Sequence, residues 1–139
     1  MITADFPYCK FKPDFLGCNC DEACLQVTLK NGGNEVTVEA LVDSGCTVTH
    51  ANSAIAEVLG IDLTTCVETL TMGINGEKDK AWLTEVVFSF QGMGEDFSGP
   101  LLFTDNLPVS ILLGQRNFFD KFDVHFRKSK HLFTLTRFG

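Results

Sequence analysis

The stretch from residue 25 to residue 42 alternates apolar with polar side chains, which is the pattern of β-strands that bury one face. Its apolar positions are Leu25, Val27, Leu29, Val36, Val38, Ala40 and Val42. The middle of the stretch, residues 31–34, reads Asn-Gly-Gly-Asn and favours a tight hairpin turn. The sequence therefore predicts two antiparallel strands, of which the second ends on an acidic residue, Asp43.

The chain beyond Asp43 carries further strand signals and little helix. A second hairpin is predicted from strands at 67–72 and 80–90 with a turn at 73–76, and shorter strands are predicted at 101–103, 109–113, 122–126 and 132–138. Short helices are predicted at 52–59 and 116–122. The predicted fold class is all-β with one or two short helices.

The first 24 residues lack this pattern and contain Pro7, Pro13 and Gly17, which interrupt any regular periodicity. We therefore predict an irregular, cysteine-rich N-terminal extension over residues 1–24 and one β domain over residues 25–139. A chain of 139 residues, of which 45% are hydrophobic, is large enough to bury a core in a single domain.

The charge of the chain limits its partners. A net charge of −7 and a pI near 4.8 disfavour nucleic acids and anionic membranes, because their phosphate groups would be repelled. No apolar run approaches the length of a membrane span, and residues 1–5 lack the basic and apolar regions of a signal peptide. These features predict a cytoplasmic protein.

Four of the six cysteines lie near the N-terminus, at Cys9, Cys18, Cys20 and Cys24. In an exported protein such cysteines would form disulfides, whereas without a leader peptide reduced thiols or a metal site are favoured. Their spacing is not that of a standard zinc ribbon, so unliganded thiols are the prediction and a bound zinc ion is the alternative. No other cofactor is predicted.

Residues 41–45 read Leu-Val-Asp-Ser-Gly and form the strongest candidate for a functional site. A buried strand rarely ends on an unpaired carboxylate, because desolvating that group is costly. Gly45 permits a tight turn or a close backbone approach. Asp43 is therefore a candidate acid–base group, and the alternative is an ordinary turn. Cys46 and His50 suggest a further alternative, a thiol–imidazole pair.

Three features occur in a fixed order: a strand ending in Asp43-Ser44-Gly45, a Gly-rich hairpin at 73–76, and an apolar strand ending in Leu112-Leu113-Gly114. This order resembles the retropepsin-like aspartic proteases, and residues 111–124 resemble the bacterial-type members in particular. The resemblance covers about residues 25–138. It implies a closed β-barrel that corresponds to one half of an acid protease and carries a flap hairpin.

The resemblance also implies a peptidase in which two carboxylates share one proton around a water molecule. Because the motif occurs once in this chain, the second carboxylate must come from another copy. The implied active form is a homodimer with both Asp43 residues at its two-fold axis, acting on a peptide or protein substrate.

The resemblance assigns roles to individual residues. The catalytic loop consists of Asp43, Ser44 and Gly45, with Ser44 bonding across the dimer axis. The implied flap and substrate-binding residues are Gly73, Ile74, Asn75 and Gly76, together with Cys46 and Thr47. Leu112, Leu113 and Gly114 are implied to support the loop.

Three positions depart from the family pattern. Many retropepsins have Ala and Asp where this chain has Cys46 and Thr47, and retroviral members have an Arg where it has Gln115. Both ends of an ion pair are therefore neutral, which suggests a Thr47–Gln115 hydrogen bond or a changed dimer contact. The alternative function is a non-catalytic, protease-like module that binds peptide or organises a dimer.

Overall fold

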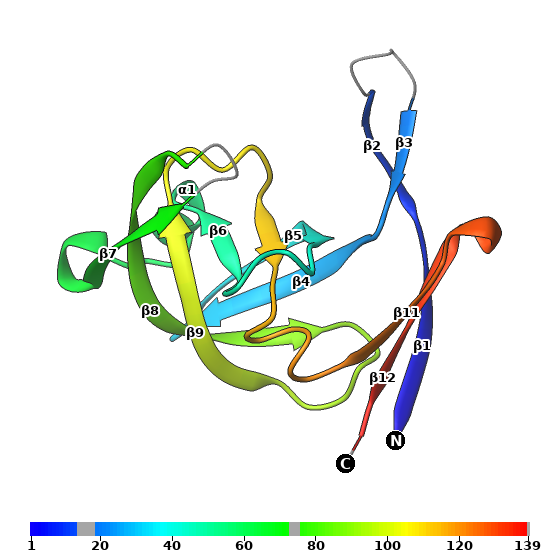
Figure 1. The fold of residues 1–139 in the computed structure, drawn as a ribbon. Coiled ribbons are helices and arrows are strands. Elements are labelled where there is room, and N and C mark those ends of the chain that lie inside the picture. The colour runs from blue at the N-terminus through cyan, green and yellow to red at the C-terminus, as the bar shows by residue number, and fades with distance from the viewer. Residues whose placement is uncertain (14–18, 73–75, 139) are drawn as a thin grey trace.

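The structure is a computed structural model that describes residues 1–13, 19–72 and 76–138, with the backbone alone for residues 10–13 and 19–21 (Figure 1). Its largest unit is a barrel whose strands follow one another in the order β4 (Cys24–Asn31), β5 (Asn34–Val42), β10 (Ile111–Leu113), β6 (His50–Asn52), β9 (Phe97–Thr104) and β8 (Lys78–Phe90). Pairing of β4 with β8 closes the ring, and β7 (Val67–Met72) is an outer strand on β8. The predicted all-β, closed-barrel fold is confirmed.

Both predicted hairpins are present. β4 and β5 pair in antiparallel register from Cys24 opposite Leu41 to Asn31 opposite Asn34, around the Gly-rich turn. Gly32 has a φ of 58° there, a backbone conformation that favours glycine. β7 and β8 form the second hairpin, which is also antiparallel.

Inward-facing side chains of the barrel and side chains from the segments beside it form one hydrophobic core. Its largest fully buried members include Phe88, Phe103, Phe118, Phe133, Leu29, Leu59, Met93, Leu101, Ile111 and Leu113. Phe90 of β8 lies with its ring centroid 5.6 Å from that of Phe118 and 5.1 Å from that of Phe122. These aromatic contacts fasten the segment that follows β10 onto the barrel.

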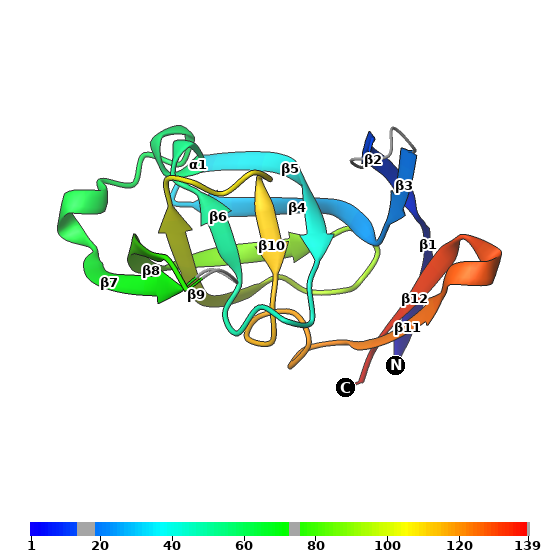
Figure 2. The same cartoon turned by 45° about the horizontal axis from the view of Figure 1, so that its top comes forward.

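β10 lies between β5 and β6, parallel to β5 and antiparallel to β6 (Figure 2). In this register Leu113 is opposite Val42, so the C-terminal ends of β5 and β10 lie side by side. The next residues along each strand are Asp43 and Gly114. The sheet topology therefore brings together two motifs that are far apart in the sequence.

The N-terminal segment is not irregular as predicted. β1 (Ile2–Pro7), β12 (Leu132–Arg137) and β11 (Asp123–Arg127) form a three-stranded sheet beside the barrel, and β2 (Cys9–Pro13) pairs with β3 (Asn19–Glu22) (Figure 1). Phe6 stacks on Phe133 with ring centroids 5.5 Å apart. The first strand is thus ordered by pairing with the last one, and the predicted irregular conformation of residues 1–24 is wrong where the chain is described.

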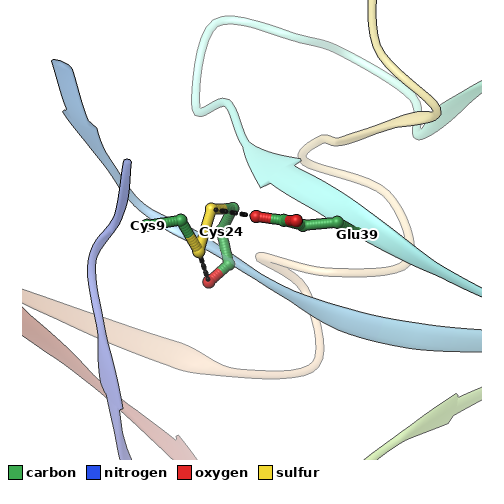
Figure 3. A group of neighbouring side chains, drawn as sticks. All are labelled: Cys9, Cys24 and Glu39. Carbon is green, nitrogen blue, oxygen red and sulfur yellow. Dashed lines mark hydrogen bonds between the residues drawn. A yellow bond between two sulfur atoms is a disulfide. The ribbon is translucent and has the colours of Figure 1, made fainter. Parts of the chain in front are cut away.

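Cys9 and Cys24 form a disulfide that joins the start of β2 to the start of β4 (Figure 3). The predicted unliganded thiols are therefore wrong for these two residues. The zinc alternative is wrong for them too, because metal ions bind thiolates. Glu39 points toward this pair, with Oε1 3.0 Å from the Cys24 sulfur. Cys18 lies outside the described residues, as does the side chain of Cys20.

The described residues contain one α-helix, α1 (Ala54–Val58), within the predicted helix at 52–59. Two 3-10 helices, η1 (Leu63–Thr65) and η2 (Lys128–Lys130), are each one turn long. The helix predicted at 116–122 is wrong: residues 116 and 117 form isolated β-bridges, and residues 118–121 form turns. Asn117 has a φ of 79°, which a right-handed helix does not accommodate. No helix in the described part of the chain is long and apolar enough to cross a membrane.

Candidate active site

Asp43 lies directly after β5 in the loop of residues 43–49, here called the Asp43 loop, which leads to β6. Hydrogen bonds hold this loop. Its backbone N–H donates to the carbonyl oxygen of Leu113 at 2.9 Å. The N–H of Gly45 donates to Asp43 Oδ1 at 3.0 Å, and that of Cys46 donates to the Asp43 carbonyl oxygen at 3.1 Å. Asp43 is half-buried, whereas Ser44 and Gly45 are exposed. The carboxylate is thus oriented by its own loop while part of it stays accessible.

The segment after β10 holds the same loop from the other side. The N–H of Gln115 donates to the Cys46 carbonyl oxygen at 2.8 Å, and that of Arg116 donates to the Thr47 carbonyl oxygen at 3.1 Å. The side-chain amide of Gln115 donates to the carbonyl oxygen of Ser44 at 2.7 Å. Gln115 therefore bonds to the loop backbone and not to the side chain of Thr47, which is exposed.

Thr49 is a fully buried residue of this site that the sequence analysis missed. Its hydroxyl donates to the Arg116 carbonyl oxygen at 2.9 Å and accepts from the Gly114 N–H at 3.1 Å. Because this buried hydroxyl makes both hydrogen bonds, it leaves no polar group unsatisfied. It also joins the Asp43 loop to the segment after β10. Threonine is common on exposed strand faces, so nothing in the sequence distinguishes this one.

Leu112, Leu113 and Gly114 lie against the Asp43 loop, where we predicted supporting residues. Leu113 and Gly114 are buried, and Leu112 is half-buried. A Cβ atom on Gly114 would lie 2.5 Å from the carbonyl oxygen of Cys46, closer than packed atoms allow. The close approach of the two backbones therefore requires glycine at this position.

Cys46 and His50, the suggested thiol–imidazole pair, are close, with Sγ 3.2 Å from Nδ1. His50 Nδ1 lies 2.6 Å from the Val48 carbonyl oxygen, which can only accept, so Nδ1 carries a proton and cannot take one from the thiol. Cys46 Sγ is also 2.9 Å from this oxygen. Burial and, to a smaller extent, the charge of Asp43 raise the pKa of the Cys46 thiol to about 11. The thiol is therefore protonated at neutral pH and is not an activated nucleophile.

The sequence matches the aspartyl protease family over residues 25–116, which is more than half of the chain and includes the Asp43 loop, β10 and Gly114. This chain belongs to the aspartyl protease family. A comparison with curated protein sequences gives no significant match.

Two solved structures of related fold agree with this membership. A retropepsin-like aspartic protease from Rickettsia conorii is 20% identical, with a TM-score of 0.66 over 96% of this chain and 90% of the other. EIAV protease in complex with an inhibitor is also 20% identical, with a TM-score of 0.55 over 71% of this chain and 86% of the other. The fold of this aspartyl protease family member is therefore retropepsin-like.

The flap and substrate-binding residues expected in this family member are only partly described. Gly73, Ile74 and Asn75 lie outside the described residues. Gly76 is exposed and has a φ of 81°, which favours glycine. Thr47 is exposed within the Asp43 loop. Their roles in substrate binding remain predictions.

We expect Cys46 to be alkylated slowly at neutral pH and faster as the pH rises toward about 11, because the thiolate is the reactive form and the pKa of this thiol is raised. Peptide mapping by mass spectrometry after timed exposure to iodoacetamide measures the rate at Cys46 alone. We also expect the variant Cys46→Ser to retain peptide cleavage. A rate that levels off near pH 7, or loss of cleavage in Cys46→Ser, would restore the thiol–imidazole alternative.

Proposed function

We propose that this chain is an aspartic endopeptidase that acts as a homodimer and hydrolyses peptide bonds with a water molecule activated between two Asp43 carboxylates, one from each subunit. The observation that carries the proposal is the Asp43 loop, in which Leu113 holds the Asp43 backbone and the Gly45 N–H orients a partly accessible carboxylate. Family membership supports protease chemistry. The single Asp-Ser-Gly motif in the sequence supports a site that is shared between two chains.

The chemistry follows from placing two carboxyl groups next to each other. They cannot both ionise easily, so one stays protonated, and their pKa values belong to the pair. The ionised group takes a proton from the water, whose oxygen attacks the peptide carbonyl carbon, while the protonated group gives its proton to the carbonyl oxygen. The carbon–nitrogen bond then breaks as the nitrogen receives the proton that came from the water, and the carbonyl re-forms as its oxygen returns the other.

The neighbouring residues have supporting roles in this proposal. Ser44 and Gly45 are exposed, so they are available to a second subunit and to substrate. We assign Ser44 to a hydrogen bond across the dimer axis and the Gly45 backbone to an extended peptide bound by β-strand addition. Residues 73–76, which follow β7 in the sequence, are assigned to a flap that excludes water from bound substrate.

The test is a mixing experiment with wild-type protein and the variant Asp43→Asn. We expect sedimentation to give twice the chain mass of 15.3 kDa and wild-type protein to cleave a peptide library between mildly acidic and neutral pH. After subunit exchange, a mixture of equal amounts of wild type and variant should have about one quarter of the activity of the same total amount of pure wild-type protein. Only about that share of the dimers has two Asp43 residues. About one half would remain if a single chain were sufficient, and that result would contradict the shared site.

The second candidate function is a non-catalytic module that binds peptide or organises a dimer. The neutral side chains of Thr47 and Gln115, at positions where retroviral members are expected to have an ion pair, favour this candidate. A wild-type protein that stays monomeric, or that binds peptides without cleaving any of them, would support it over the endopeptidase.

A further inference from the structure

His50, the first residue of β6, bonds both to the backbone just before it and to a side chain on β7, which comes later in the sequence. Its Nδ1 lies 2.6 Å from the carbonyl oxygen of Val48, and its Nε2 lies 2.8 Å from the hydroxyl of Thr71 on β7. We propose that His50 is a positioning residue that ties β7 to the end of the Asp43 loop and so fixes one wall of the peptide-binding site. The proposal rests on the endopeptidase function for its consequence, though not for the contact itself.

The bond between His50 and Thr71 joins strands that are not neighbours in the sheet. β9 and β8 separate β6 from β7 in the order of the sheet, so this side-chain contact links two strands that share no backbone pairing. β7 is paired with β8 along one edge, and its side chains are largely exposed. The exposed fractions are 66% for Val67, 61% for Leu70 and 65% for Met72, whereas Thr71 is half-buried. The His50 contact is therefore an anchor for a strand that has little packing of its own.

The tautomer of His50 follows from its partners. The Val48 carbonyl accepts only, so Nδ1 donates to it, and Nε2 of the neutral ring then accepts from the Thr71 hydroxyl. If the ring is protonated, Nε2–H donates to the same hydroxyl oxygen. The bridge persists in both charge states, which suits a fixed tether.

The tether and the catalytic carboxylate are held by separate bonds. The Val48 carbonyl oxygen, which accepts from both the His50 ring and the Cys46 thiol, lies at the end of the Asp43 loop. The bonds that orient Asp43 itself come from Leu113, Gly45 and the backbone N–H of Cys46, and none of them involves the His50 ring or Thr71. Loss of the tether should therefore weaken peptide binding and leave the chemical step largely intact.

The variant Thr71→Val tests this separation, because it removes the hydroxyl at nearly constant shape. We expect KM to rise by about three- to tenfold, the size of one lost hydrogen bond, with kcat within about twofold of wild type. The separate variant Thr71→Ser keeps a hydroxyl and should have the KM of wild type. Thr69→Val is the matched control on the same strand, since Thr69 is exposed and lies opposite Ala81.

The variant His50→Asn tests the same bridge from its other end. The shorter amide can still donate to the Val48 carbonyl but does not reach Thr71. We expect the KM of His50→Asn to match that of Thr71→Val, and the double variant to show no further increase, because both changes remove one bond. Additive increases in KM would contradict a shared tether.

Nitrogen NMR of the imidazole rings gives a readout that does not depend on cleavage. The signals of His50 are those missing from His50→Asn, and they should show the Nδ1-protonated tautomer in the neutral ring. Thr71→Val should shift the Nε2 signal, whereas Thr71→Ser and Thr69→Val should not. An Nε2-protonated ring, an unmoved Nε2 signal or an unchanged KM in Thr71→Val would overturn the proposal. If wild type shows the Nδ1-protonated tautomer and Thr71→Val shifts the Nε2 signal, but wild type cleaves no peptide, the endopeptidase is refuted and the tether remains supported.

Discussion

Replacing Asp43 with Asn is expected to lower kcat/KM for peptide cleavage by about a thousandfold or more, which is the scale of a lost acid–base group. The amide is neutral at every working pH, so it can neither take a proton from water nor share one with the second subunit. Steady-state cleavage of a fluorogenic peptide measures the change, with the enzyme concentration raised to follow the residual rate.

The fold and the dimer should survive this substitution. The Asn side chain keeps an oxygen that can accept the Gly45 N–H, and the backbone bond to Leu113 does not involve the side chain. Sedimentation and thermal unfolding should therefore match wild type. Asp123→Asn is the control for removing an acidic side chain, because Asp123 is exposed at the start of β11. Cleavage retained by Asp43→Asn would rule out the proposed mechanism.

The parts of the fold that the sequence predicted are those governed by neighbouring residues. The β4–β5 hairpin follows from alternation over 25–42 and from the turn at 31–34, both of which are local signals. Because the alternation fixes which face is buried, it also placed Asp43 at the end of a strand. The prediction of a closed barrel then came from the family resemblance and not from the spacing of the strands.

The parts that the sequence did not predict depend on distant pairing. β1 carries only a short alternation before Pro7, and what orders it is β12, at the other end of the chain. The contact of His50 with Thr71 forms only when the closed barrel brings β6 and β7 together. Disulfide formation by Cys9 likewise depends on where β2 and β4 place the two thiols.

Replacing Gly114 with Ala is expected to lower the free energy of unfolding by about 3 kcal/mol, the upper range for overpacking a core. The added Cβ would lie 2.5 Å from the Cys46 carbonyl oxygen and 3.0 Å from the Val48 carbonyl carbon. Both are backbone atoms, which cannot turn aside as a flexible side chain would. Urea unfolding, followed by the circular dichroism of the strands, measures the loss.

This substitution should also reduce cleavage in protein that remains folded, because relief of the clash must move β10 away from the Asp43 loop. The bond from the Asp43 N–H to Leu113 and the bond from the Gly114 N–H to Thr49 would then lengthen together. Gly33→Ala is the matched control, since a Cβ there meets no atom within 4 Å and should change stability by less than about 1 kcal/mol. If Gly114→Ala were as stable and active as Gly33→Ala, the close approach of β10 to the loop could not be what holds Asp43 in place.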